Sequence, residues 1–280
     1  GKINVIDYFT IATTGNASDF GDATVARCRL NGGSNGSIGV AFGGYTSGNS
    51  NVIDYVTIGT TGNATDFGDL TSARDGGGSA CDGNYGFFAG GNPGNFTAVI
   101  DYVSVTTPGN GADFGDLDVA RYLTTGVNDL TRACMGAGDS ATGGLHMNII
   151  DYFTMATPGN ATDFGDLSIS RASPGSCSSS GGRGIFGGGY IDDSYNRTDN
   201  MEYITIATTG NGSDFGDLTH DPDTPAGCSN GSRGIFCGGY PNSPNSLTIT
   251  YITIDGPVNN AVDFGDLNDG RWQHASFSGT

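Results

Sequence analysis

Short segments in which hydrophobic and polar residues alternate recur along the whole chain. The clearest are residues 6–11, 53–58 and 150–155, each with the order Ile-Asp-Tyr, Phe or Val, Thr, and Ile or Met. Alternation of β-branched and aromatic residues with polar ones is typical of a half-buried strand. A turn of the type Thr-Gly-Asn or Pro-Gly-Asn follows each segment. The pattern therefore predicts strand-and-turn units. In the last copy Asn259 replaces the turn glycine, which favours a turn with a positive φ.

A second type of hydrophobic segment ends in paired glycines. It occupies residues 39–45, 86–91, 184–190 and 234–240, and a degenerate copy stands at 136–138. Continuous short apolar runs bounded by glycines are consistent with buried strands. Each repeating unit is thus expected to hold about four short strands separated by turns.

The tetrapeptide Asp-Phe-Gly-Asp sets the period of the chain. It occurs six times, at intervals of 47 to 51 residues. Repeats of this length, each with four strands, are the sequence signature of a β-propeller. We therefore predict an all-β fold in which residues 1–280 form one six-bladed propeller domain. A right-handed β-solenoid is the structural rival, although its coils are usually shorter.

The repeated polar residues are expected to be structural. In this interpretation the first Asp caps a turn, the Phe anchors the blade, and the second Asp meets an Arg that follows eight residues after the first Asp. Pro222 replaces that Arg in the fifth copy. The residues concerned are Asp19, Phe20, Asp22 and Arg27; Asp66, Phe67, Asp69 and Arg74; Asp113, Phe114, Asp116 and Arg121; Asp163, Phe164, Asp166 and Arg171; Asp214, Phe215 and Asp217; and Asp263, Phe264, Asp266 and Arg271. A calcium site in each blade is the alternative, but the ladder of alternating Asp residues typical of such loops is missing.

The composition supports a fold of strands and turns. Fifty glycines accompany a single Glu and a single Lys, so the residues that favour helices are nearly absent. The net charge of −18 and the dispersed arginines argue against nucleic acid or an anionic membrane as a partner. Twelve aspartates belong to the Asp-Phe-Gly-Asp repeats, so much of this charge belongs to the repeated framework.

The repeat resembles the Kelch family. The shared features are a strand ending in Gly-Gly, a following strand with a Tyr, a turn, and an Arg before the next inner strand; the Trp of the Kelch turn is absent. The longer phrase Tyr-x-Thr-Ile-Ala-Thr-Thr-Gly-Asn-Ala-Thr-Asp-Phe-Gly-Asp-Leu-Thr-x-Ala-Arg is similar to Kelch-like arrays in virion structural proteins of marine bacteriophages. This resemblance implies a Kelch-like propeller in a virion or at an extracellular location.

The sixth repeat is shorter than the others. Counted through both termini, it lacks 11 to 15 residues, equivalent to the strand at 84–94. The last blade is therefore expected to combine segments from both chain ends and to lack one strand. Three explanations stay open: the chain is part of a longer polypeptide, the blade has three strands, or a neighbouring chain inserts the missing strand.

The sequence offers little catalytic chemistry. The histidines lie in different repeats without a recurring partner, and the six cysteines show no metal-ligand spacing, which favours free, buried thiols. We therefore expect no enzyme activity, no catalytic residue and no cofactor or metal. Carboxylates on the rim of the channel leave a hydrolytic site formally open.

Recognition residues are expected where the repeats differ. The candidates for ligand or partner binding are Tyr190, Tyr195, Arg197, Tyr240 and Trp272, which lie in irregular loops. The expected function is a non-enzymatic virion component, a surface decoration or a tail-fibre-associated scaffold. Its partners would be other virion proteins, copies of itself or a host-surface glycan. The alternatives are a secreted domain that binds or hydrolyses glycans and a subunit of a self-assembling extracellular filament.

Overall fold

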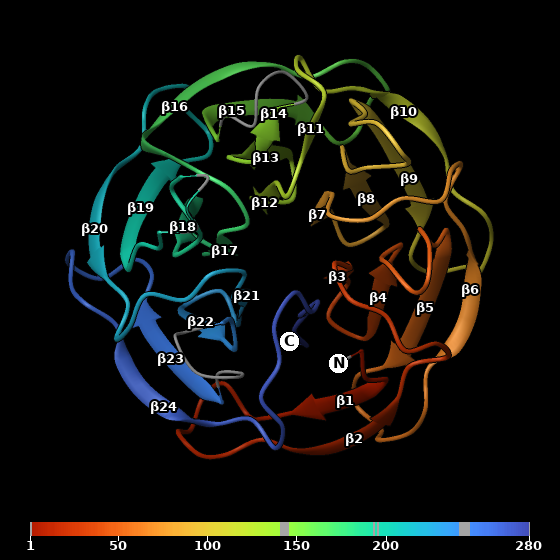
Figure 1. The fold of residues 1–280 in the computed structure, drawn as a ribbon, viewed down its shortest axis with the longest axis horizontal. Coiled ribbons are helices and arrows are strands. Elements are labelled where there is room, and N and C mark those ends of the chain that lie inside the picture. The colour runs from red at the N-terminus through yellow and green to blue at the C-terminus, as the bar shows by residue number, and fades with distance from the viewer. Residues whose placement is uncertain (1, 141–145, 193, 195, 241–246, 280) are drawn as a thin grey trace.

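The strands are arranged as a β-propeller around a central axis (Figure 1). The computed structural model describes every residue except 1, 141–145, 193, 195, 241–246 and 280. The described residues form strands, turns and bends without any helix, so none forms a helix that could cross a membrane. The prediction of an all-β propeller is confirmed.

Five sheets have four antiparallel strands each, and these form the complete blades. The first has β3 (Asn31–Ser34), β4 (Ile38–Phe42), β5 (Val52–Thr57) and β6 (Thr65–Asp69). The second has β7 (Gly78–Cys81), β8 (Tyr85–Ala89), β9 (Val99–Ser104) and β10 (Ala112–Asp116). The third has β12 (Thr125–Asn128), β13 (Arg132–Gly136), β15 (Met147–Thr154) and β16 (Thr162–Arg171). The fourth has β17 (Gly175–Ser178), β18 (Arg183–Gly187), β19 (Asn200–Thr205) and β20 (Ser213–Asp217). The fifth has β21 (Ala226–Ser229), β22 (Arg233–Cys237), β23 (Thr248–Thr253) and β24 (Val262–Asp266).

The prediction of six blades needs correction. At the sixth position the described residues form only a two-stranded sheet, β1 (Val5–Tyr8) with β2 (Ser18–Asp22). The C-terminal residues 275–278 lie at the inner position of this repeat, near the axis, without pairing to β1 (Figure 1). Both chain ends thus contribute to the last position, as expected. This position lacks the strand that corresponds to β4 of the first blade, because no described residue provides it. A further short pair, β11 (Arg121–Tyr122) with β14 (Asp139–Ser140), extends the third blade.

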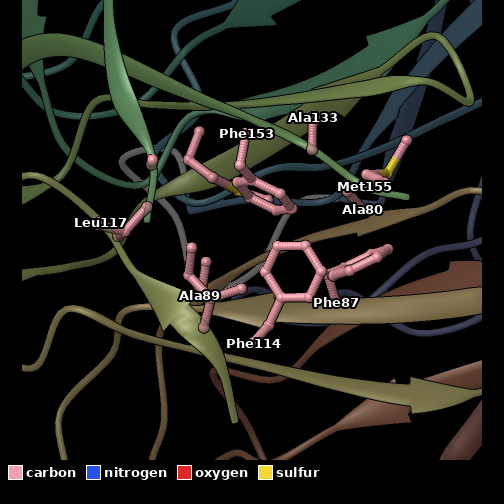
Figure 2. Close-up of a cluster of buried hydrophobic side chains, with 11 residues drawn as sticks. Ala80, Phe87, Ala89, Phe114, Leu117, Ala133, Phe153 and Met155 are labelled. Carbon is pink, nitrogen blue, oxygen red and sulfur yellow. The ribbon is translucent and has the colours of Figure 1, made fainter. Parts of the chain in front are cut away.

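The hydrophobic core lies between neighbouring blades. Figure 2 shows one such cluster, in which Phe87 of β8 and Phe114 of β10 meet Phe153 of β15 in the next blade. The Phe87 and Phe114 rings stand edge to face, with centroids 5.1 Å apart, the geometry that aromatic pairs prefer. Every Phe of the Asp-Phe-Gly-Asp repeat is buried, which confirms the predicted anchoring role. Each of these rings also meets the repeated Tyr edge to face.

Adjacent blades are joined at the outer rim by one repeated backbone arrangement. Gly109 N–H donates to Phe67 O at 2.8 Å, and Asn110 Oδ1 accepts the N–H of Asp69 at 3.1 Å. The same bonds occur at all six joints. The last one connects Gly15 and Asn16 to Phe264 and Asp266 and closes the ring. Asparagine follows the turn position in every copy, after a glycine in five copies and after Asn259 in the last, because its side chain makes this bond.

The conformation expected for the turn glycine is not found. Gly15 and Gly62 are nearly extended, with φ of 159°, and Asn259 does not have a positive φ. A Cβ added to Gly109 would meet nothing within 4 Å, so a side chain fits at this position. The strict requirement lies instead at the glycine of Asp-Phe-Gly-Asp. A Cβ on Gly68 would lie 2.3 Å from Gly109 O of the next blade.

Candidate functional site

The repeated arginines form buried ion pairs, but with a different partner from the one predicted. Arg121 Nη1 donates to Asp151 Oδ2 at 2.8 Å, and Arg121 Nη2 donates to the carbonyl oxygen of Met135, also at 2.8 Å. Asp151 is on the Tyr-bearing strand of the same blade, not in the Asp-Phe-Gly-Asp segment. The equivalent pairs are Arg27 with Asp54, Arg74 with Asp101, Arg171 with Glu202, and Arg271 with Asp7. The pair of Arg271 with Asp7 joins the two chain ends.

The second Asp of each repeat has another task. The backbone N–H of Asp69 donates to Asn110 Oδ1 at the outer joint, and among the described residues its carboxylate forms no ion pair. The first Asp does not cap a turn either. Asp66 is an exposed strand residue in β6, opposite Asp54, next to a shift in strand register. The predicted roles of these two aspartates are therefore wrong.

The fifth repeat lacks this buried ion pair. Pro222 stands in place of the Arg, and Thr250 stands in place of the acid. Thr250 is buried, and its hydroxyl donates to Phe236 O at 3.5 Å. Both charged partners are replaced together because a single buried charge without its partner is costly. The ion pairs of the other repeats brace the segment that carries the Arg against the Tyr-bearing strand.

Three of the five predicted recognition residues lie together. The Arg197 guanidinium is 5.1 Å from the centroid of the Tyr240 ring, and the Tyr240 and Trp272 rings are 6.4 Å apart at 68°. Tyr240 and Trp272 are 38% and 39% exposed. Arg197 Nε is 3.4 Å from Asp223 Oδ2, which orients the guanidinium. We call Arg197, Tyr240 and Trp272 the aromatic patch.

The other two predicted residues are not part of this patch. Tyr190 is buried, because its backbone pairs with Ala172 and its ring packs edge to face on His146. Its predicted exposure is therefore wrong. Tyr195 lies outside the described residues.

A basic and aromatic cluster that the sequence analysis missed surrounds Tyr45. The Lys2 ammonium lies 4.3 Å from the Tyr45 ring centroid, and the Arg29 guanidinium lies 5.8 Å from the same point. Arg29 Nε also donates to Gln273 Oε1 at 3.1 Å, beside Trp272 in the chain. Tyr45 follows paired glycines, as Tyr190 and Tyr240 do, and this shared position was the available signal.

A cavity of about 600 Å³ opens at the incomplete blade. Its lining includes Phe9, Ile11, Ala41, Cys228 and Phe277. It lies between the C-terminal segment and β1, in the place that the second strand occupies in each complete blade. Pockets of 300 to 1,000 Å³ with mainly apolar walls are the usual size for binding sites.

His274 and Cys237 meet at the wall of this cavity. Cys237 Sγ lies 3.6 Å from His274 Nε2. Burial raises the pKa of the Cys237 thiol to about 12, so the thiolate needed for nucleophilic chemistry is disfavoured. Burial and the neighbouring Arg271 lower the pKa of His274 to about 3, and its Nδ1 is buried without a partner. This pair is therefore suited to packing rather than acid–base catalysis at neutral pH.

Lowering the pH below 6.5 is expected to destabilise the protein through His274. A histidine with a depressed folded pKa stays neutral in the fold, so protonation favours the unfolded chain. Stability from this residue is complete above its unfolded pKa of about 6.5 and falls as the pH approaches 3. Urea midpoints of the wild type and His274→Gln at pH 7 and pH 4.5 test this. The drop between the two pH values should be smaller in the variant, and an equal drop would contradict the assignment.

The sequence left chemistry open at three further places: the cysteines, the metal-ligating side chains and the space at the axis. All six cysteines are unpaired in the structure, and five of them are buried, as expected for free thiols. Within the described ranges no three His, Cys, Asp or Glu residues are grouped so that they could share a metal ion. The narrow space at the axis, about 60 Å³, is lined by Arg29, His274 and many small residues, and no carboxylate is among its lining residues.

Comparison with known proteins adds no relative. No protein-family model matches the chain, and no curated protein sequence matches it significantly.

Proposed function

We propose that the protein is a non-enzymatic Kelch-like scaffold in which six repeats form one rigid ring that presents the aromatic patch to a partner. In this proposal it serves as a virion decoration or tail-fibre-associated component, located on the particle outside the host cell. Its partners are other virion proteins or a host surface. The resemblance of its repeat to Kelch-like arrays of bacteriophage virion proteins supports the virion assignment.

The observation that carries the proposal is the convergence of Arg197, Tyr240 and Trp272. They come from three different places in the sequence, and Tyr240 and Trp272 are more than a third exposed. Arginine and large aromatic residues are enriched at the energetic centres of protein interfaces. The framework below them is fixed by six outer joints and five ion pairs, so little ordering is needed on binding.

The acidic charge supports the choice of partner. A net charge of −18 repels nucleic acid and anionic membranes, and the aromatic patch places the Arg197 guanidinium beside the exposed Tyr240 ring. The patch suits a neutral or acidic protein surface.

Binding should depend on Trp272. The expected result is co-purification of the chain with density-banded virus particles, reduced at least about tenfold in Trp272→Ala through loss of a central aromatic contact. Leu130→Ala is the matched control, since Leu130 is 66% exposed at the opposite end of a blade. Equal attachment of both variants would contradict the role of the patch.

A glycan-binding function is the second candidate, because exposed aromatic rings beside polar groups also suit sugar binding. A glycan array distinguishes the two. Specific glycan binding that Trp272→Ala abolishes, without attachment to particles, would replace the first proposal. Concentration-dependent polymers in negative stain would instead indicate a filament subunit.

A further inference from the structure

The cavity at the incomplete blade has the place and walls of a strand site. In the first blade, β4 fills this place and pairs with β3 on one side and β5 on the other. At the sixth position, the segment 275–278 corresponds to β3 and β1 corresponds to β5. The space between them is the cavity of about 600 Å³, lined by apolar side chains from both sides.

Backbone groups around the cavity lack the partners that their counterparts have. Ile58 N–H donates to Ser37 O, and Val105 N–H donates to Asn84 O, each at 2.8 Å. Among the described residues nothing accepts from the equivalent N–H of Ile11. Gly44 N–H donates to Arg74 O at 3.0 Å and Gly91 N–H donates to Arg121 O at 2.8 Å, whereas no described donor reaches Arg27 O. One missing strand accounts for both unpaired groups.

Arg27 shows the same deficiency in its side chain. Its guanidinium is 1% exposed and lines the cavity, yet Nη1 and Nε have no hydrogen-bond partner. Nε lacks a partner in Arg74 and Arg171 as well, whereas Arg74 Nη1 bonds to Ser72. Val25 takes the place of Ser72 before Arg27, so Nη1 is the donor that Arg27 alone leaves unpaired at the cavity. Buried donors without acceptors are costly, so a carbonyl-bearing chain in the cavity would be favoured here.

The walls are already held in place on every side. Ser276 Oγ donates to Gly227 O at 2.6 Å, and Ser34 Oγ donates to Ser278 O, which fixes the C-terminal segment between its two neighbours at the axis. The outer joint of Gly15 with Phe264 fixes β1 and β2. A preformed site reduces the ordering cost of binding an extended peptide.

We propose that this cavity, here called the strand slot, binds an extended segment of a second polypeptide, antiparallel to β1, with the pattern Gly, Ile or Val, Phe or Ala, one small residue, Gly-Gly-Tyr. The second strands of the five complete blades each occupy their own blade, so no described residue is free to fill the slot; β18 and β22 with the residues that follow them carry the whole pattern. Addition of a strand to unpaired sheet edges is a recurrent mode of peptide recognition. The slot shares Trp272 with the aromatic patch, through its backbone, but the two proposals are tested by different measurements, so either can fail alone.

The neighbouring blades determine the pattern. A Cβ on Gly234 would lie 2.4 Å from Cys177 Sγ of the preceding blade. A segment bound in the slot of the sixth position would place its corresponding residue opposite Cys228 of the fifth blade. This residue of the segment must therefore be glycine. Paired glycines are favoured because Gly43 and Gly44 have φ of 57° and 105°, and a Cβ on Gly43 would lie 2.5 Å from Arg74 O; in the third blade Ala137 holds the first of these positions with φ of 62°.

The final Tyr of the pattern has a ready backbone partner. In the first blade Tyr45 pairs with Cys28, the residue after the repeated Arg, and in the fifth blade Tyr240 pairs with Asp223. The equivalent residue at the sixth position is Trp272, which forms no such bridge.

The test uses a capped peptide with the sequence of residues 183–190, Arg-Gly-Ile-Phe-Gly-Gly-Gly-Tyr, and the 280-residue chain. Calorimetry is expected to show one peptide bound per chain. The melting temperature should rise by roughly 5 °C at saturating peptide, because a ligand that binds only the folded state stabilises it. Hydrogen exchange should show new protection at Ile11 and residues 275–279.

A matched pair of peptide and protein changes identifies the site. The peptide with Gly184→Val should bind at least about tenfold more weakly, because its side chain meets Cys228. Cys228→Ala should restore binding of this altered peptide and leave the original nearly unchanged. Absence of binding, equal binding of both peptides to the wild type, or protection confined to another part of the ring would overturn the proposal.

Discussion

Gly68→Ala is expected to lower the melting temperature by roughly 10 °C, a large effect for one methyl group. Its Cβ would lie 2.3 Å from Gly109 O and 2.5 Å from Gly109 C in the next blade, and backbone atoms cannot move aside as a flexible side chain can. The φ of 148° adds strain for any residue with a Cβ. The joint between two blades must therefore open. Differential scanning calorimetry measures the change.

Gly109→Ala is the matched control on the other side of the same joint. A Cβ on Gly109 meets nothing within 4 Å, so the melting temperature should change by less than about 2 °C. If Gly109→Ala destabilised the protein as much as Gly68→Ala, the close approach would not be the cause. Soluble expression of both variants at reduced temperature keeps the comparison measurable.

Arg121→Leu is expected to cost about 3–5 kcal/mol of unfolding free energy. Both Arg121 and Asp151 are fully buried, and the substitution leaves the carboxylate without its counter-ion. Burial already raises the pKa of Asp151 even with Arg121 beside it, and loss of the cation raises it further. Urea denaturation of the wild type and the variant measures the loss.

The pH dependence of that variant follows from the sign of the shift. An acid whose folded pKa is raised is preferentially neutral in the fold, so the cost of the unpaired carboxylate is present at neutral pH. It diminishes as the pH falls through the raised pKa toward the unfolded value of about 3.9. The difference between wild type and Arg121→Leu should thus be smaller at pH 4.5 than at pH 7.

The fifth repeat suggests a double variant that should recover the stability lost in Arg121→Leu. Arg121→Leu combined with Asp151→Thr reproduces its uncharged pair, in which Thr250 is buried without any ionic partner. The double variant is expected to recover at least about half of the lost stability, because both buried charges are removed together. Additive losses in the double variant would show that the ion pair is not the source of the effect.

Much of the fold could be predicted from the period of the chain. Local sequence pattern predicted that the Phe of each repeat and the cysteines are buried. Counting the residues between repeats predicted that both chain ends share the last blade position. The ion-pair partner of the repeated Arg could not be predicted in this way. Asp22 is only five residues from Arg27 in the sequence. The ion-pair partner of Arg27 is instead Asp54, on a strand that comes later in the chain. Sequence distance is a poor guide to contacts across a sheet.

A signal for the correct partner was nevertheless present. The fifth repeat loses its Arg to Pro222 and its strand acid to Thr250, while it keeps both aspartates of Asp-Phe-Gly-Asp. The role of Gly68 had no comparable signal. Its requirement comes from the Gly109 carbonyl of the next blade, and that approach depends on how neighbouring blades stack.

The joint between Gly15 and Phe264 has a consequence for the order in which the protein is made. Its two sides are about 250 residues apart, while the other five joints link residues about 41 to 46 apart. During synthesis each of those five can form as soon as the next repeat emerges, because domains assemble from the N-terminus onward. The closing joint must wait until Phe264 and Asp266 have been made. Until these two residues emerge from the ribosome, the nascent propeller is an open arc, and their arrival allows it to close into a circle.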